Sequence, residues 1–292
     1  KEGMRLLRAA TIKGDVRATW LLGEFLLDGH QWFDDIPQNV KEGLKFTRRA
    51  ARQENATALY SLGKIYEDGE YVTKNMKKAM TYYSRAADQD YTPAITALGR
   101  IELYGLNGTA NYDKAYEHLV TASESGFDDN ADHLLGQLYL SGLGCTQDDE
   151  LAFKLFLSTE HLPESRYQLG CCRFLGAGTG RDFYLAHTDF LNAVHAEPDC
   201  YYWLGEMYRN GWGCEMDERA AFDSFLKGLE TSATNVPKLQ MGLGRAFYFG
   251  EGVDENIEEA IKWLTLSLER EREREAIFLL ARCYLDDGHE DV

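Results

Sequence analysis

The segment that decides the fold is Ala58-Leu59-Tyr60-Ser61-Leu62-Gly63-Lys64-Ile65-Tyr66-Glu67-Asp68-Gly69. Its apolar residues recur at the three- and four-residue spacing of an amphipathic helix. The Leu-Gly pair at its centre occurs seven times in the chain and once more as Leu-Ala, with the second residue of the pair at Gly23, Gly63, Gly99, Gly136, Gly170, Gly205, Gly244 and Ala281. Successive glycines lie 34 to 40 residues apart, a period that indicates stacked two-helix units and not one globular core.

A second glycine follows six residues after the first in seven copies, at Gly29, Gly69, Gly105, Gly142, Gly176, Gly211 and Gly250. Glycine adopts a left-handed conformation without a Cβ clash, so it suits the position just past the last turn of a helix. We therefore expect the first helix of each unit, helix A, to end at this glycine.

A second amphipathic stretch, helix B, follows each helix A. It carries a small residue sixteen positions after the first glycine, at Ala79, Ala115, Ala152, Ala186, Ala221 and Ala260. In the first copy the interval from Gly23 to Gly43 is twenty, so the segment around His30-Gln31-Trp32-Phe33 carries a four-residue insertion. The sequence thus predicts an all-α solenoid of stacked antiparallel helix pairs, with seven A–B repeats and a half-repeat at each end.

The first glycine of each copy lies in the middle of helix A, where it costs roughly 1 kcal/mol relative to alanine. Its return in seven copies indicates that a neighbouring helix passes too close for a side chain. Proline marks the start of helix A at Pro93, Pro163, Pro198 and Pro237, where its missing N–H does no harm.

Residues 1–292 are expected to form a single solenoid domain, because stacked repeats contact chiefly their neighbours. The chain starts within a segment that matches helix B and stops after Ala276 to Asp287, which match helix A. Since terminal repeats of a solenoid need polar caps, we expect a fragment of a longer protein.

The net charge of −17 argues against a nucleic-acid partner, because such binding needs clustered Lys and Arg. No apolar run approaches the ~20 residues that cross a bilayer, so we expect no membrane insertion of this segment. Six irregularly spaced cysteines favour reduced thiols and a cytoplasmic location. Two glycosylation sequons, Asn55-Ala56-Thr57 and Asn107-Gly108-Thr109, keep the ER lumen or an extracellular location as the alternative.

Residue patterns that would carry catalysis do not occur in the sequence. The seven histidines show no i, i+4 pair with a glutamate between them, which a zinc hydrolase would need. The run Gly176-Ala177-Gly178-Thr179-Gly180-Arg181 has the wrong glycine spacing for a phosphate-binding loop. Cys171-Cys172 is a reactive pair only if a base lies nearby, and buried thiols are the alternative. We therefore predict no metal, no cofactor, no small-molecule substrate and no enzymatic activity.

The pattern Ala-x-x-x-Leu-Gly-x-x-Tyr-x-x-Gly, with its spaced alanine and an aromatic residue on helix B, resembles the Sel-one-like repeat (SLR), a relative of the tetratricopeptide repeat. The resemblance runs along essentially the whole chain. It implies a right-handed superhelix with helix A on the concave face, and adaptor proteins without catalysis that assemble complexes, among them ER-associated degradation machinery. The chain departs from the usual repeat at Thr179-Gly180-Arg181-Asp182, in the insertion at Trp32 and in the charged run from Glu269 to Glu275.

By the same resemblance, the residue after each first glycine points into the groove that the concave face forms. The residues three positions further on form a second, mostly apolar row along this groove. From these rows we predict a peptide-binding surface for an extended or helical segment with acidic and hydrophobic residues, formed by Lys64, Arg100, Gln137, Leu103, Leu140, Phe174, Arg209, Arg245, Tyr248 and Arg282. The alternative is that the apolar row packs against the next helix and the bases pair with neighbouring acids.

The function that these features favour is a protein-binding scaffold or adaptor that assembles a multiprotein complex. Two alternatives stay open. The first is a luminal or cell-surface subunit of a membrane-anchored complex, and the second is a regulatory repeat domain attached to an enzyme.

Overall fold

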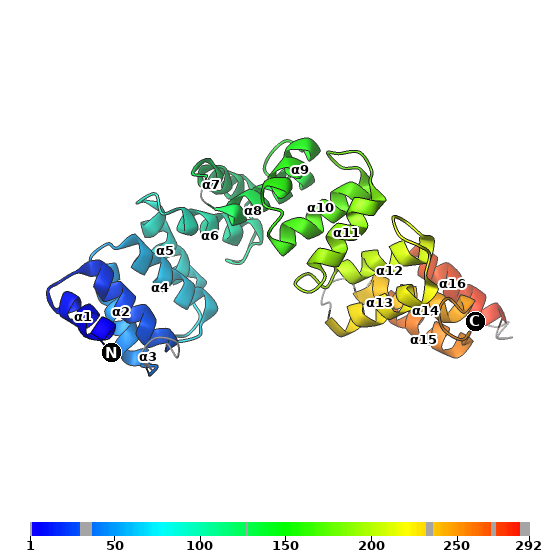
Figure 1. Cartoon of the computed structure of the whole chain (residues 1–292), viewed down its shortest axis with the longest axis horizontal. Helices are drawn as coiled ribbons and strands as arrows, with labels where there is room; N and C mark the ends of the chain where they lie inside the picture. The colour runs from blue at the N-terminus through cyan, green and yellow to red at the C-terminus, as the bar shows by residue number, and fades with distance from the viewer. Residues whose placement is uncertain (1, 30–36, 127, 232–235, 270–272, 287–292) are drawn as a thin grey trace. The chain divides into compact units, whose positions relative to one another are not determined.

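The structure is a computed structural model that describes residues 2–29, 37–126, 128–231, 236–269 and 273–286. These residues form sixteen α-helices, and no strand occurs among them (Figure 1). The predicted insertion at His30 to Phe33 and the centre of the charged run, residues 270–272, lie outside the described residues.

The helices follow the predicted order, a half-repeat, seven A–B pairs and a second half-repeat. They are α1 (Glu2–Ile12), α2 (Val16–Asp28), α3 (Val40–Arg52), α4 (Ala56–Asp68), α5 (Met76–Ala87), α6 (Thr92–Leu103), α7 (Tyr112–Glu124), α8 (Asp129–Ser141), α9 (Asp149–Ser158), α10 (Pro163–Leu175), α11 (Phe183–Ala193), α12 (Cys200–Asn210), α13 (Glu218–Thr231), α14 (Val236–Phe249), α15 (Ile257–Leu268) and α16 (Arg274–Asp286). From α2 onward the even-numbered helices are therefore A helices, and the odd-numbered helices are B helices. The all-α solenoid prediction is confirmed.

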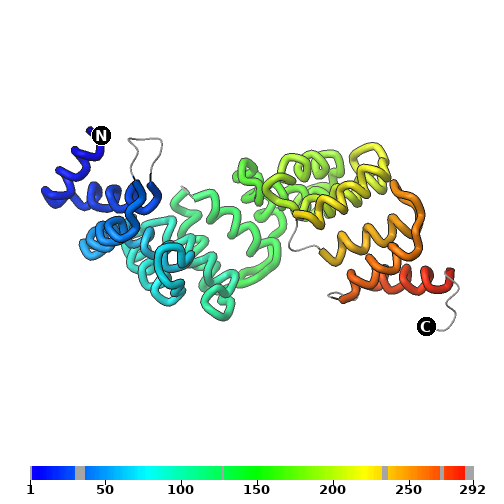
Figure 2. The backbone as a smooth tube through the Cα atoms, turned by 90° about the horizontal axis from the view of Figure 1, so that it is seen from below, coloured from blue at the N-terminus to red at the C-terminus, as the bar shows by residue number. Residues whose placement is uncertain are grey.

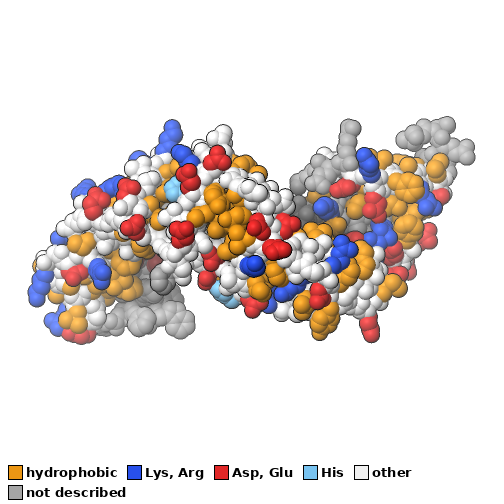
Figure 3. All heavy atoms as spheres, turned by 90° about the horizontal axis from the view of Figure 1, so that it is seen from above, with side chains coloured by type: hydrophobic (Ala, Val, Ile, Leu, Met, Phe, Trp, Pro, Cys, Tyr) orange, Lys and Arg blue, Asp and Glu red, His pale blue; other side chains and the backbone are white. Residues whose placement is uncertain are grey.

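Contacts between Cα atoms divide the chain into two compact units, the N-terminal unit (residues 1–147) and the C-terminal unit (residues 148–292). Within each unit, consecutive helices lie side by side (Figure 2). The N-terminal unit holds 17 Lys and Arg against 20 Asp and Glu, a net charge of −3, whereas the C-terminal unit holds 14 against 28, a net charge of −14. Figure 3 shows hydrophobic side chains in patches among these charges. That residues 1–292 form one domain stays a prediction.

The mid-helix glycines lie where helix A and helix B of one repeat are closest. A Cβ atom at Gly99 would lie 2.7 Å from Cγ of Leu119, and one at Gly170 would lie 2.7 Å from the ring of Phe190. In both repeats the residue that it would meet comes twenty positions after the glycine. The first repeat follows the same rule with its insertion added, because Gly23 faces Thr47, twenty-four positions later. The predicted close packing is confirmed.

The core of each repeat consists of small and apolar side chains from both helices. The predicted alanines of helix B, from Ala79 to Ala260, are all at most 2% exposed. The largest fully buried side chains are aromatic residues of the B helices, Tyr83 in the N-terminal unit and Phe156, Phe190 and Phe225 in the C-terminal unit. Tyr83, Phe190 and Phe225 each face the mid-helix glycine of their own repeat. The predicted spacing of small residues therefore lets two helices approach, and the aromatic residues fill the remaining volume.

A recurring clamp joins the end of helix A to the start of helix B. The side chain of Asn75 accepts a hydrogen bond from the N–H of Lys78 at 2.9 Å and caps α5. The Asn75 N–H in turn donates to the carbonyl of Tyr66 on α4 at 2.8 Å. Asn39, Asn111, Asp182, Asp217 and Asn256 make equivalent backbone bonds. Such caps satisfy the free N–H groups of the first turn and fix the angle at which helix B leaves the turn.

Candidate functional site

The N-terminal A face consists of side chains of α2, α4, α6 and α8. At its start, the indole Nε1 of Trp20 donates to the hydroxyl of Ser61 on the next A helix at 3.0 Å. Glu24 lies beside this pair, and its buried Oε1 has no hydrogen-bond partner among the described residues. Burial raises the pKa of Glu24, and the smaller effects of Ser61 and Lys64 oppose that shift. The exposed Lys64 forms no ion pair with any residue that the structure describes.

The second part of this face is a network around Glu67. Its carboxylate forms an ion pair with Arg100 of the next A helix and accepts a hydrogen bond from the Tyr83 hydroxyl at 2.8 Å. Burial and the Glu67 carboxylate raise the pKa of Tyr83, so this hydroxyl stays a donor. The ring of Tyr60 packs between those of Tyr83 and Tyr91, with centroids 5.6 and 5.5 Å away. Arg100 is thus held in place by the preceding repeat, and Tyr60 by two rings of its own repeat.

The last part of the N-terminal A face is polar and half-exposed. Gln137 accepts a hydrogen bond from the Tyr104 hydroxyl at 2.8 Å and lies 3.0 Å from Nε2 of His133. Leu140 is half-exposed, whereas Leu103 is only 7% exposed and belongs to the core. Of these residues, Tyr104, Gln137 and Leu140 present surface that a partner could contact.

The C-terminal A face, on α10, α12, α14 and α16, begins with an aromatic cluster around Phe174. The ring of Phe174 lies 5.2 Å from Phe183, 5.0 Å from Trp203 and 5.4 Å from Trp212, measured between centroids. Trp212 is 36% exposed, so the cluster reaches the surface. Tyrosine and tryptophan at such positions are common anchors in protein interfaces.

The middle of the C-terminal A face is charged. Arg209 donates to Glu206 at 2.6 Å, and both side chains are largely buried. Beside them, burial raises the pKa of Tyr202 to about 12, with smaller contributions from Glu206 and two further glutamates. The ammonium group of Lys238 lies 5.5 Å from the centroid of the Tyr202 ring, at cation–π distance.

The last two predicted bases, Arg245 and Arg282, also contact other side chains of the chain. Arg245 pairs with Glu275 on α16 at 3.1 Å and with Glu251 at 3.5 Å. The guanidinium of Arg282 lies 5.6 Å from the ring of Tyr248, which is itself 7% exposed. The alternative interpretation is that the bases of this surface pair with neighbouring acids. It holds for Arg100, Arg209 and Arg245. Whether the ten predicted residues bind a peptide stays a prediction.

Sequence reasoning missed the contacts that join one A helix to the next. The Trp20–Ser61 bond in the N-terminal unit and the bond from Trp203 Nε1 to the Tyr167 hydroxyl, 3.4 Å long, in the C-terminal unit use the same repeat positions. In both pairs, the first residue lies three positions before the glycine of its repeat. Its partner lies two positions before the glycine of the next repeat. Aligning these two positions across successive repeats would have identified the pairs.

Two sequence features weighed for catalysis, the Cys171-Cys172 pair and the glycine-rich run at Gly176, lie among the described residues. No group of three His, Cys, Asp or Glu side chains that could hold a metal occurs among the described residues. Burial raises the pKa of Cys171 to about 12 and that of Cys172 to about 11, which disfavours the reactive thiolate. A Cβ at Gly178 would collide with the backbone carbonyl of Asp149, so this turn packs against a neighbouring helix. No helix in the described part of the chain is long and apolar enough to span a membrane.

The Sel1 repeat family matches seven segments of the sequence, residues 16–55, 56–91, 92–127, 130–158, 163–187, 198–223 and 237–270. The chain belongs to the Sel1 repeat family. Each matched Sel1 repeat coincides with one A–B pair, from α2–α3 to α14–α15. Sel1 repeat proteins are generally scaffolds for protein–protein interaction.

Two solved structures show the same fold. A protective antigen of uropathogenic Escherichia coli with an SLR fold is 22% identical, with a TM-score of 0.71, over 97% of this chain and 67% of that chain. A Sel1 repeat protein from Oxalobacter formigenes is 25% identical, with a TM-score of 0.64, over 95% of this chain and 79% of that one. The comparison with curated proteins finds no match.

Proposed function

We propose that the protein is a scaffold without catalytic activity, which binds segments of partner proteins on its A faces and so holds them in an assembly. The observation that carries this proposal is the half-exposed row of aromatic and polar side chains on the A helices, which includes Trp20, Tyr60 and Tyr202. Aromatic residues dominate the binding energy of protein interfaces. Their hydrogen bonds and ring contacts hold them rigid, which lowers the entropy lost on binding.

The N-terminal A face favours a peptide that combines an acidic with a hydrophobic residue. Lys64 is exposed and without an ion-pair partner among the described residues, so it can pair with a carboxylate. On the same face, Tyr104 and Leu140 offer apolar surface. Three arginines of the predicted surface, Arg100, Arg209 and Arg245, would first have to leave Glu67, Glu206 and Glu275.

The experiment is a peptide-display selection on the full chain, followed by affinity measurements with Lys64→Glu and Lys77→Glu. Lys77 is an exposed lysine on the B helix α5, so the second variant has the same change in charge away from the A face. We expect Lys64→Glu to weaken binding of the selected peptides about tenfold, since like charges across an interface repel. Equal losses in the two variants would refute recognition by the A face.

We further propose a cytoplasmic location, which the free thiols of all six cysteines support. The structure identifies which sequon tests it. Asn55 uses its side chain to cap α4, accepting from the N–H of Ala58 at 2.9 Å, whereas Asn107 is exposed in a turn. A glycan on Asn107 in the protein isolated from its own cells would refute the cytoplasmic proposal.

A further inference from the structure

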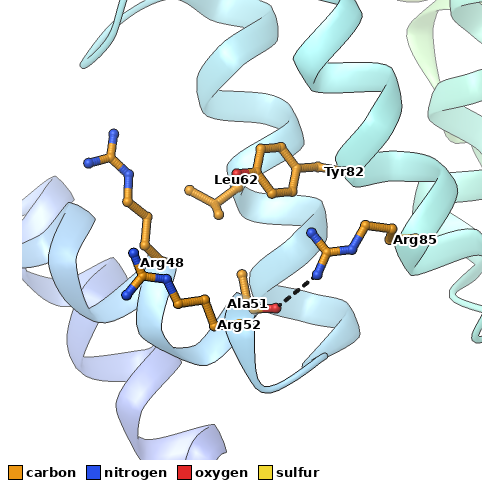
Figure 4. A pocket seen from close by; sticks show the side chains of 6 residues that line it. All are labelled: Arg48, Ala51, Arg52, Leu62, Tyr82 and Arg85. Atoms are coloured by element: carbon orange, nitrogen blue, oxygen red, sulfur yellow. Dashed lines mark hydrogen bonds between the residues drawn. The ribbon is translucent and has the colours of Figure 1, made fainter.

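An open pocket of about 100 Å³ lies between two successive B helices of the N-terminal unit, over the A helix that both contact. It is lined by Arg48, Ala51, Arg52, Leu62, Tyr82 and Arg85. Arg48 and Arg52 come from α3, and Arg85 comes from α5. Figure 4 shows the two α3 guanidinium groups on one side of the pocket and that of Arg85 on the other. Three of the six lining side chains are thus permanently cationic.

The positive charge of this pocket continues along α3. The helix carries five bases, Lys41, Lys45, Arg48, Arg49 and Arg52, against a single acid, Glu42, which pairs with Arg8. Arg48 and Arg52 are exposed, lie one turn apart and form no ion pair with any described residue. The helix dipole favours cations in the last turn, which accounts for Arg52 but not for Arg48 or for Arg85 of another helix.

Arg85 already holds a carboxylate at the rim of the pocket. Its guanidinium donates to Glu54 at 2.5 Å and to the carbonyl of Ala51 at 3.4 Å. The same group lies 5.7 Å from the centroid of the Tyr82 ring, which keeps it against the wall. Glu54 is exposed, so its carboxylate shows that an anion can reach this guanidinium from solvent.

We propose that this arginine pocket binds a phosphate monoester carried by a phosphorylated peptide segment. A phosphate group has a charge of −1.5 to −2 at pH 7 and three acceptor oxygens, and arginine forks bind such groups through paired N–H donors. A single carboxylate, as in Glu54, occupies one of the three arginines and leaves the two on α3 free. Arg48 and Arg52 are exposed, so their side chains can rotate onto the ligand.

A peptide fits this pocket better than a membrane or a nucleic acid. Both of those are extended polyanions, and they would meet a chain of net charge −17 outside this short basic stripe. A single phosphate on a flexible segment needs only the pocket itself. Five of the six lining residues come from the B helices α3 and α5, and the sixth, Leu62 of α4, is buried. The site is therefore separate from the exposed side chains of the A faces and does not depend on the function proposed for them.

The test uses the full chain and a fluorescent heptapeptide of glycine and serine with one central phosphoserine, compared with the same peptide unphosphorylated. Binding is measured by anisotropy, and the arginine Nε–Hε signals are followed by NMR. We expect the phosphopeptide to bind and to shift the signals of Arg48, Arg52 and Arg85. The double variant Arg48→Gln/Arg52→Gln should bind at least tenfold more weakly, and inorganic phosphate should compete.

The matched control is Lys45→Gln/Arg49→Gln, which removes the same charge from the same helix at residues that do not line the pocket. We expect it to change affinity less than twofold. Equal losses in the two double variants would overturn the proposal, because they would indicate a diffuse basic surface. Binding to vesicles rich in phosphatidylserine with none to the phosphopeptide would also overturn it, as would the absence of phosphopeptide binding at millimolar concentration.

Two further variants test the geometry of the pocket. Glu54→Gln removes the carboxylate that occupies Arg85, so we expect affinity for the phosphopeptide to rise about threefold. Arg85→Lys keeps the charge but loses the planar fork, and we expect it to weaken binding about fivefold with unchanged circular dichroism. Unchanged affinity in both variants would refute a role for Arg85.

Discussion

The same two positions of the repeat are occupied in opposite order in the two units, with the acid on helix A in one and on helix B in the other. In α6 and α7 of the N-terminal unit, Glu102 on helix A accepts a hydrogen bond from Nδ1 of His118 on helix B at 2.8 Å. In α10 and α11 of the C-terminal unit, Arg173 stands on helix A and pairs with Asp189 on helix B. In both units the helix A residue comes three positions after the repeat glycine, and the helix B residue comes nineteen positions after it. The repeat therefore determines where two side chains meet, while their chemistry is free to change.

The surfaces of the two units differ in the same way. The N-terminal unit is close to electrically balanced and concentrates on α3 bases that form no ion pair with any described residue, whereas the C-terminal unit carries a net charge of −14. The C-terminal unit instead exposes part of an aromatic cluster at Trp212. A common backbone with two different surfaces is what a scaffold with more than one partner requires.

The largest difference between the units should come from Arg173→Ala. This change leaves Asp189, whose side chain is 7% exposed, without its partner, and breaking a buried pair costs about 3 kcal/mol. His118→Ala also leaves a buried carboxylate, since Glu102 is 7% exposed. It should cost less, about 1 kcal/mol, because the imidazole that it removes is one third exposed and, unlike arginine, is not permanently charged. Urea unfolding followed by circular dichroism measures both.

The pH dependence of Arg173→Ala sharpens this comparison. Burial raises the pKa of Asp189 even with Arg173 present, and removing the arginine raises it further. The ionised carboxylate then lowers the free energy of unfolding most at pH values above its pKa in the folded state. The loss of stability in Arg173→Ala should therefore be largest at pH 8 and shrink as the pH falls toward 4. The double variant Arg173→Met/Asp189→Leu should recover most of the stability. A smaller loss in Arg173→Ala than in His118→Ala would contradict the comparison.

A second test places a side chain at the mid-helix glycine of either unit. Gly63→Val would push against the buried Tyr83, and Gly205→Val against Phe225, at a cost of about 2 kcal/mol for overpacking. Amide hydrogen exchange should show lost protection in the substituted unit first. Gly180→Val is the control, since nothing lies within 4 Å of its Cβ position. Equal loss of protection throughout the chain would show that the two units unfold together.

The smallest expected effect compares two glutamates at one repeat position, directly after the glycine. Burial raises the pKa of Glu24, so its ionised form destabilises the folded state at neutral pH. Glu24→Gln should therefore raise the free energy of unfolding by about 1 kcal/mol at pH 7, and the gain should vanish as the carboxylate becomes protonated below about pH 4. Glu206→Gln should lower stability instead, because Glu206 pairs with Arg209. A gain in both variants would refute the assignment.

Much of the fold could be predicted because it depends on contacts within one repeat. Gly99 and Leu119, or Gly170 and Phe190, are twenty residues apart, so a single copy already holds both partners. The pairing of Arg100 with Glu67 and of Arg245 with Glu275 could not be predicted in this way, since each crosses into a neighbouring repeat. Exposure of Lys64 and burial of Leu103 likewise depend on how neighbouring helices cover one another.

The clamp at the start of helix B explains how the first repeat accommodates its additional residues. Asn39 still donates its N–H to the carbonyl of Leu26, at 2.7 Å, although four more residues separate the two than separate Asn75 from Tyr66. Helix packing thus depends on the two ends of the A–B connection and not on its length. Protein engineers could insert an epitope or a small reporter domain at this connection without disturbing the repeats on either side.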